Sequence, residues 1–364
     1  MAITEAAIIK ALQTVDDPDL KKDLVTLNMI KDVQVEGNRV KFTVVLTTPA
    51  CPLKEVIRKA CEDAIHTLVS DAAEVDILMT SNVTTTRDNT PLLPQVKNII
   101  AVASGKGGVG KSTVAANLAV ALSKTGAKVG LIDADIYGPS IPTMFNCERE
   151  QPGITQIDGK NMIVPLEQYG VKLISIGFLT PPENAVVWRG PMASSALKQF
   201  LGDTLWGELD YLLIDLPPGT SDIHLTLVQS VPVTGAVIVT TPQKVALADA
   251  KKGVAMFKQP QINVPILGIV ENMAYFTPEE LPENKYYIFG QGGGRNLALA
   301  NDVPLLGEIP IVQSIRESGD SGYPAVLKDG LVAEAFSHLA ESVARSVAIR
   351  NANVAETKKV EIIT

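Results

Sequence analysis

Residues 105–112 read Gly105-Lys106-Gly107-Gly108-Val109-Gly110-Lys111-Ser112, and they closely follow the apolar run from Ile99 to Ala103. This order fits the pattern G-x-x-x-x-G-K-[ST], in which a strand leads into a loop whose backbone N–H groups surround a phosphate. The segment from Thr113 to Ala119 is typical of a helix, whose N-terminal dipole attracts anions. The stretch therefore predicts a nucleotide site formed by residues 105–113, with Lys111 on the β- and γ-phosphates and the Ser112 hydroxyl on Mg²⁺.

The same glycines also satisfy G-x-G-x-x-G, the fingerprint of a dinucleotide-binding loop, through Gly105, Gly107 and Gly110. Asp133 lies near the distance at which such a fold keeps its ribose-binding acid. A loop that binds only a pyrophosphate needs neither the lysine nor the hydroxyl that end this stretch. We therefore favour a nucleoside-triphosphate loop over a dinucleotide loop.

The composition of the 364 residues is ordinary for a soluble globular protein, with 46% hydrophobic and 20% charged residues. A formal net charge of −8 does not favour nucleic acid or anionic lipid as a partner. The three cysteines are too few for a disulfide framework and fit a reducing compartment: Cys51, Cys61 and Cys147. We find neither a signal peptide nor an apolar run of about 20 residues, so we expect a cytoplasmic protein with no membrane partner.

The chain divides into segments of different character. Residues 1–80 predict a small α+β domain, and residues 81–97, which are polar with two prolines, predict a linker. Residues 98–349 predict an α/β domain with a mostly parallel sheet and helices on both faces, because apolar strand-sized runs alternate with helical segments. Within it, residues 146–169 are rich in turn residues and indicate an insertion or a mobile excursion. Residues 350–364 are expected to be disordered.

The expected elements can be listed by residue range. Helices of the small domain are expected over 4–15 and 53–69, and strands over 33–35, 40–46 and 75–79. Strands of the large domain are expected over 99–103, 128–132, 172–176, 211–214, 235–240, 266–271 and 305–306, and a final helix over 333–349.

Acidic residues follow two of the expected strands. Asp133 and Asp135 follow the strand 128–132, and Asp215 ends the strand 211–214. The carboxyl ends of neighbouring parallel strands face the same crevice as the phosphate loop. We expect Asp135 to orient the attacking water, Asp133 to support the Mg²⁺ shell and Asp215 to be the acid on the metal side.

Three further residues lie near this edge of the sheet. Gly219 follows Asp215 by four residues, so its N–H can bind the γ-phosphate and release it after hydrolysis, as a switch does. Asn272 ends another expected strand; its side chain either contacts a purine edge or is an ordinary turn residue. His224 is interpreted either as a structural residue or as a surface residue of a mobile loop, rather than as a base.

With these elements in place, the chain resembles the deviant phosphate-loop ATPases, which carry an extra lysine at the position of Lys106. Within them it closely resembles the Mrp/ApbC-type iron–sulfur cluster carriers. The N-terminal domain is similar to a small domain of iron–sulfur assembly proteins. The matching runs are Asp133–Ser140, Trp188–Met192, Asp215–His224, Ile288–Gly290 with Gly292–Gly294, and, in the small domain, Asp17-Pro18 and Thr48–Pro52.

The resemblance implies a homodimer that holds two ATP molecules between its subunits. Lys106 would reach the partner's phosphates, so that Lys106, Lys111 and Asp135 form the catalytic set, and Asn272 would contact adenine. The implied function is ATP-dependent binding of iron–sulfur clusters and their delivery to apoproteins.

The chain departs from that family at one point, because no Cys-x-x-Cys pair follows Asn272. Clusters normally need thiolate ligands. Cys51 is the best remaining candidate, since it precedes a proline and a helix start, where a thiolate is favoured. Cys61 lies ten residues on, and a helix would hold the two about 15 Å apart. The alternative function is a switch or scaffold ATPase of the partitioning or positioning type, which binds no cluster.

Overall fold

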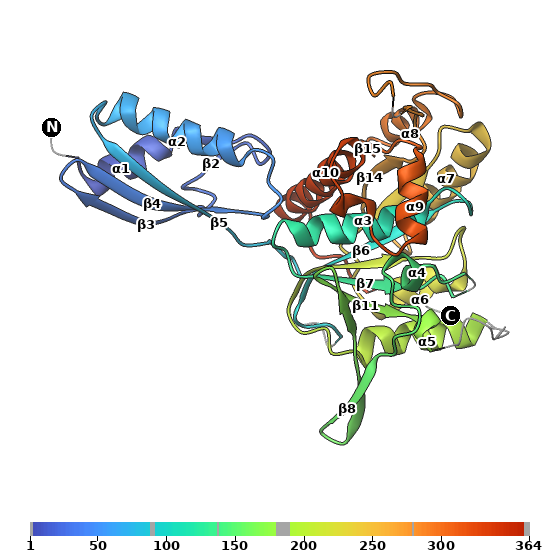
Figure 1. Cartoon of the computed structure of the whole chain (residues 1–364). Coiled ribbons are helices and arrows are strands. Elements are labelled where there is room, and N and C mark those ends of the chain that lie inside the picture. Colours follow the sequence, from blue (N-terminus) through green and yellow to red (C-terminus); the bar gives the residue numbers. More distant parts are fainter. Residues whose placement is uncertain (1–2, 88–91, 137, 180–189, 279, 360–364) are drawn as a thin grey trace. The chain divides into compact units, whose positions relative to one another are not determined.

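The structure is a computed structural model of the chain, and it describes residues 3–87, 92–136, 138–179, 190–278 and 280–359. These residues form two compact units (Figure 1). The smaller unit contains the residues up to Thr84 together with Ala348–Val354, and the larger unit contains Thr85–Val347 and the segment that starts at Ala355.

The smaller unit is a three-stranded sheet with two helices on one face (Figure 1). Its central strand β4 alternates exposed and buried residues, so Phe42 and Val44 face the helices. Ile8 and Leu12 from the first helix and Ile57 from the second complete the core. The elements are α1 (Glu5–Leu12), β1 (Asp16–Asp17), β2 (Lys22–Asp23), β3 (Ile30–Glu36), β4 (Arg39–Leu46), α2 (Lys54–Leu68) and β5 (Glu74–Ser81).

The larger unit is built on an eight-stranded sheet with the order β10-β11-β7-β12-β6-β13-β14-β15. Only the edge pair β10–β11 is antiparallel, and the other pairs are parallel, which confirms the predicted fold class. The strands are β6 (Val96–Ser104), β7 (Val129–Asp133), β10 (Leu166–Gln168), β11 (Val171–Ser175), β12 (Leu209–Asp215), β13 (Gly235–Thr240), β14 (Ile266–Glu271) and β15 (Leu305–Glu308).

Helices cover both faces of this sheet (Figure 1). Ile99, Ala101 and Ala103 of β6 share one core with the helices α5, α6 and α7, while α3 packs on β6, β7 and β12. The helices are α3 (Lys111–Lys124), α4 (Ile141–Met144), α5 (Gly190–Gly202), α6 (Asp222–Ser230), α7 (Lys244–Phe257), α8 (Gly293–Ala300), α9 (Gln313–Asp320) and α10 (Leu331–Asn353), with the 3-10 turns η1 (Ile176–Phe178) and η2 (Ala325–Leu327).

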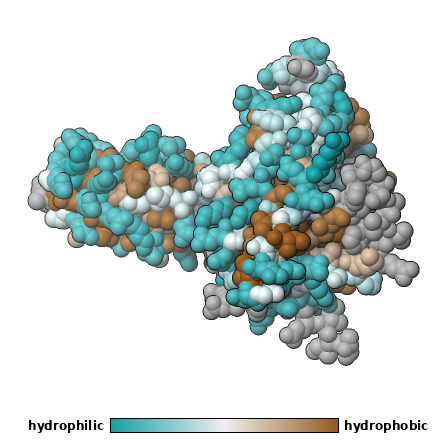
Figure 2. Space-filling view, turned by 60° about the horizontal axis from the view of Figure 1, so that its bottom comes forward, coloured by the Kyte–Doolittle hydropathy of each residue, from teal (hydrophilic) through white to brown (hydrophobic). Residues whose placement is uncertain are grey.

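The structure adds detail to two segments that the sequence left irregular. The segment 146–169 contains a β-hairpin of β8 (Gly153–Ile157) and β9 (Lys160–Val164), which the sequence did not predict. Its two-residue turn, Asp158-Gly159, has φ of 50° and 78°, the left-handed backbone that suits a tight hairpin. In addition, α10 continues to Asn353, so the start of the expected disordered tail is helical; residues 360–364 lie outside the described ranges. Apolar side chains interrupt the hydrophilic surface (Figure 2), and exposed ones in the larger unit include Ile154 of the hairpin.

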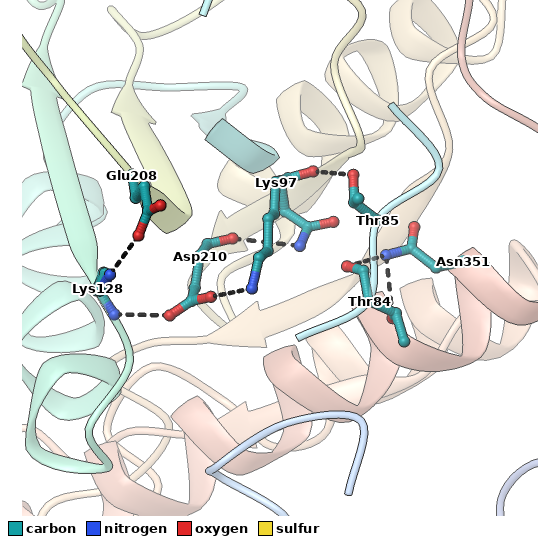
Figure 3. A network of polar contacts seen from close by, with 8 residues as sticks. Thr84, Thr85, Lys97, Lys128, Glu208, Asp210 and Asn351 are labelled. Carbon is teal, nitrogen blue, oxygen red and sulfur yellow. Dashed lines mark hydrogen bonds and ion pairs between the residues drawn. The ribbon is translucent and has the colours of Figure 1, made fainter. Parts of the chain in front are cut away.

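Residues at both ends of the segment expected to be a linker make hydrogen bonds or ion pairs. Thr85 Oγ1 donates to the Lys97 carbonyl at 2.6 Å, and Lys97 Nζ lies 2.9 Å from Asp210 Oδ1 (Figure 3). Asp210 Oδ2 also accepts the Lys128 N–H at 2.9 Å, so one carboxylate joins the starts of β6, β7 and β12. Within the smaller unit, Asn351 Nδ2 donates to the Thr84 carbonyl at 2.9 Å.

None of the helices in the described residues combines the length and the apolar character that crossing a membrane requires.

Candidate nucleotide-binding site

The glycine loop lies between the end of β6 at Ser104 and the start of α3 at Lys111. Gly108 and Gly110 have φ of 81° and 78°, a backbone that side chains other than glycine rarely adopt. A Cβ on Gly105 would overlap the main chain of α7 at Asp249. The loop therefore depends on glycine both for its turns and for its close approach to α7.

Lys111 is the centre of the site's polar contacts. Its Nζ lies 2.6 Å from Asp215 Oδ1, 3.6 Å from Asp135 Oδ2 and 3.2 Å from Ser112 Oγ. The Lys111 side chain is only 5% exposed and that of Asp215 is fully buried. The structure thus brings together the lysine, the hydroxyl and two of the acids that the sequence pattern singled out.

Only one of the two carboxylate oxygens of Asp215 has a hydrogen-bond partner among the described residues. Its Oδ2 is buried and makes no hydrogen bond within the described part of the chain. Burial raises the pKa of Asp215, while the Lys111 ammonium and the Ser112 hydroxyl act to lower it. A buried, unpartnered carboxylate oxygen beside a hydroxyl suits Mg²⁺, which prefers hard oxygen ligands and keeps several waters. No group of three or more His, Cys, Asp or Glu side chains forms a metal cage among the residues described, so Mg²⁺ would depend on water and phosphate for its other ligands.

Asp133 is held by the protein itself. Its Oδ2 accepts hydrogen bonds from Ser175 Oγ at 2.9 Å and from the Ile141 N–H at 3.3 Å, and its Oδ1 accepts the Asp135 N–H at 3.2 Å. Burial and the charge of Asp215 raise the pKa of Asp133 to about 7. These contacts place Asp133 behind the site, where it orients the segment that carries Asp135. The sequence analysis did not identify Ser175 as part of the site, although it is a polar residue near the end of an expected strand.

Asp135 lies nearer the surface than the other two acids. Its side chain is 15% exposed, and burial raises its pKa, which the nearby Lys111 ammonium partly offsets. A carboxylate in this position can contact a ligand in the loop and also reach solvent. Tyr137, which follows in the matching run, lies outside the described residues.

Gly219 is bonded to the start of the glycine loop. Its N–H donates to the Ser104 carbonyl at 2.9 Å, and its φ is 83°. Ser104 Oγ in turn donates to the Lys106 carbonyl at 3.0 Å, while the Lys106 residue is exposed. The structure therefore places Gly219 beside the loop, with its N–H bonded to a carbonyl.

Asn272 also contacts the loop directly. Its Nδ2 donates to the Val109 carbonyl at 2.8 Å, and its own N–H donates to the Thr240 carbonyl at 2.8 Å. Asn272 further lines a cavity of about 500 Å³ together with Gly110 and Thr113 of the loop. Its amide thus supports the glycine loop at the edge of a cavity, a role that neither sequence interpretation included.

The later glycine run of the matching motifs has a packing role. The Gly294 N–H donates to the buried carboxylate of Glu271, and a Cβ on Gly293 would overlap Pro242. These glycines allow α8 to begin directly against the ends of β13 and β14. Trp188 and Arg189 of another matching run lie outside the described residues.

The segment after Asn272 contains no cysteine, and its two halves are joined by backbone hydrogen bonds. Phe276 and Tyr286 exchange two backbone hydrogen bonds of 2.8 Å, and Lys285 Nζ lies 4.1 Å from the centre of the Tyr275 ring. The segment in which the resemblance implied a cysteine pair thus holds an aromatic contact in this chain.

The cysteines differ in their surroundings. Burial raises the pKa of Cys61 and of Cys147 to about 12, so both stay protonated thiols at neutral pH. Cys51 is half-buried and lies just before α2. All three are described, and none forms a disulfide.

We expect acid to destabilise the protein through His224 on α6. Burial, helped by the Lys111 charge, lowers the pKa of this histidine to about 4. The unfolded chain, with an ordinary pKa near 6.5, binds the proton first, so stability is lost as pH falls from about 6.5 to about 4. In urea titrations, His224→Gln should reduce this pH-dependent loss by about 3 kcal/mol. Equal acid dependence in both proteins would contradict the assignment.

A glycine loop between a buried strand and a helix, with strand-end aspartates around its lysine, defines a P-loop NTPase. The comparisons with known proteins agree and narrow the class. The family model described as NUBPL iron-transfer P-loop NTPase matches residues 95–344, and a model described as iron–sulfur cluster assembly protein matches residues 5–77. The chain belongs to the NUBPL iron-transfer P-loop NTPase family, which overturns the dinucleotide-binding alternative.

Individual relatives are similar to this chain over much of its length. A Synechocystis protein named iron–sulfur cluster carrier protein is 48% identical over 350 residues, covering 95% of this chain and 99% of that one. An Escherichia coli protein of the same name is 46% identical over 324 residues, covering 88% and 86%. A solved nucleotide-binding protein from Archaeoglobus fulgidus, in complex with ADP, is 41% identical with a TM-score of 0.57, covering 65% and 91%.

Proposed function

We propose that this chain is an ATP-hydrolysing carrier of iron–sulfur clusters. The observation that carries the proposal is the buried contact of Lys111 with Asp215 at the glycine loop, in a chain that also contains an assembly-type domain. The Lys111 ammonium can exchange its carboxylate contacts for phosphate oxygens. A triphosphate competes with the carboxylates for this ammonium because it carries more negative charges. The relatives named as cluster carriers support the choice of cargo.

For the nucleotide, we assign residues 105–113 to the phosphates and Asn272 to the edge of the base cavity. Ser112 and Asp215 would hold Mg²⁺, with Asp133 behind them. When bound, Mg²⁺ supplies charge neutralisation for the transferred phosphate and orients it. Asp135, the most accessible of the three acids, orients the attacking water. Lys111 exchanges its carboxylate contacts for phosphate oxygens when ATP enters.

The switch and the dimer follow from two residues beside the loop. Gly219 exchanges its bond to the Ser104 carbonyl for one to the γ-phosphate, and loses it after hydrolysis. Lys106, which is exposed, reaches the phosphates of a second copy in a homodimer, where its charge offsets the negative charge that develops during transfer. We place the protein in the cytoplasm, with apoproteins as its partners and no nucleic acid or membrane.

For the cargo, we propose Cys51 as a thiolate ligand, because the other two thiols are buried and protonated. Two copies in a dimer would supply two such thiolates. The small domain (residues 1–80) thus binds the cluster, and the ATPase domain (residues 98–349), joined through the linker 81–97, controls its release.

Anaerobic reconstitution with iron and sulfide tests the cargo. Wild type should bind stoichiometric iron with a visible charge-transfer band, Cys51→Ser should lose at least half of both, and Cys61→Ala, a core control, should retain them after correction for folding. A colourless wild-type protein that still hydrolyses ATP would reject the carrier function and favour a partitioning-type switch. Full iron content in Cys51→Ser would reject Cys51 as a ligand.

A further inference from the structure

His224 is a buried titratable group that the proposed mechanism does not use. It lies in the first turn of α6 and is only 1% exposed. Burial keeps its ring neutral at physiological pH, since its pKa falls to about 4. The hydrogen bond of its ring goes to Ser221, so any role in hydrolysis passes through that residue.

The ring has polar contacts with Ser221, whose Oγ lies 3.3 Å from His224 Nδ1, and it lies 6.3 Å from the Phe257 ring. The Ser221 N–H donates to His224 Nδ1 at 3.2 Å, which is the contact that a glutamate or glutamine makes at this position of a capping box. Because Nδ1 accepts, the ring proton is assigned to Nε2, which makes no hydrogen bond within the described residues. The hydrogen bond from Ser221 thus selects the neutral tautomer with its proton on Nε2. This N–H is buried and has no acceptor among the described residues.

The capped amide ends the loop that begins at Asp215. This loop is fixed at three points along its length: the Leu216 N–H donates to the Val102 carbonyl at 3.0 Å, the Gly219 N–H to the Ser104 carbonyl at 2.9 Å, and the Ser221 N–H to His224. Gly219 is only two residues from the capped amide. A loss of the cap therefore loosens the far end of the segment that carries Gly219.

We propose that His224 is a positioning residue for ATP hydrolysis, which holds the loop so that the Gly219 N–H meets the γ-phosphate. The inference rests on the proposed function of Gly219. The cap fixes the geometry of a group that only ATP contacts, because ADP has no γ-phosphate. Its loss should accordingly reduce turnover while leaving the affinity for ADP unchanged.

Two variants separate the cap from simple packing. His224→Leu fills a similar volume but has no acceptor for the Ser221 N–H. His224→Gln keeps an acceptor at the same position of the helix. Ser230→Ala is the matched control, since Ser230 Oγ donates to the Thr226 carbonyl at 2.7 Å at the other end of α6.

The full-length variants are compared by steady-state ATP hydrolysis and by ADP calorimetry at pH 7.5. We expect His224→Leu to lower kcat by about fivefold to tenfold, the rate equivalent of the ~1 kcal/mol that a helix cap typically contributes, with ADP affinity within twofold of wild type. His224→Gln should restore kcat to within twofold, and Ser230→Ala should leave it unchanged.

The possible failures point to different conclusions. If His224→Leu lowers only the thermal midpoint, or if His224→Gln is as slow as His224→Leu, His224 has no positioning role. If Ser230→Ala slows turnover as much as His224→Leu, the effect is general to α6 and the inference fails. If wild type neither binds nor hydrolyses ATP, the proposed function itself fails, whatever the variants do.

Discussion

Lys111→Ala is expected to abolish ATP hydrolysis and also to destabilise the nucleotide-free protein. Loss of the phosphate-binding ammonium should lower kcat/KM by at least about 10²- to 10³-fold, the usual effect of removing one preorganised electrostatic group. The same change leaves the fully buried Asp215 without its partner at 2.6 Å. Breaking such a buried pair costs about 3–5 kcal/mol unless the carboxylate takes up a proton.

Two control variants make this result specific. Lys106→Ala removes an exposed lysine of the same loop and should leave the urea midpoint unchanged, although turnover in the dimer should fall. The double variant Lys111→Ala with Asp215→Asn should recover most of the lost stability but none of the activity. A Lys111→Ala protein with wild-type turnover, or one whose stability is unaffected, would contradict the role assigned to this contact.

The second large effect is expected at Asp135. Asp135→Ala should bind ATP with an affinity within about threefold of wild type, because the loop amides and Lys111 remain in place. Its kcat should fall by about 10²- to 10⁴-fold, the contribution typical of a positioned acid or base. Calorimetry and single-turnover hydrolysis measure the two quantities separately.

Asp135→Asn refines the same test, because it keeps the size and hydrogen-bonding capacity of the side chain but removes its charge. It should be as slow as the alanine variant if the carboxylate orients or deprotonates water. Normal turnover in Asp135→Ala would refute the role. A large loss of ATP affinity would show instead that Asp135 acts in binding.

Much of the larger unit could be predicted from its sequence, because buried parallel strands are continuous apolar runs. The expected strands 235–240 and 266–271 have the bounds found in the structure. The hairpin of β8 and β9 was missed because its strands are exposed and lack a buried alternation. The turn pair Asp158-Gly159 was nonetheless an available signal, since this dipeptide favours tight hairpins.

The sequence predicted residues of the candidate site, but not the hydrogen bonds that they make. The spacing of strand-end acids placed Asp133, Asp135 and Asp215 at one edge of the sheet. It did not show that Asp133 is saturated by Ser175 and the backbone, because those bonds depend on how neighbouring strands pack. The hydrogen bond from Asn272 to Val109 joins residues 163 positions apart in the sequence, so a local sequence pattern could not predict it either.

The central claim is that the glycine loop and Lys111 bind the triphosphate of Mg²⁺-ATP, and calorimetric titration of the full-length protein tests it most directly. We predict one nucleotide bound per chain for wild type, no measurable association for Lys111→Ala, and retained binding for Asp135→Ala. A wild-type protein that releases no heat with Mg²⁺-ATP, or a Lys111→Ala variant that binds it as wild type does, would contradict the account.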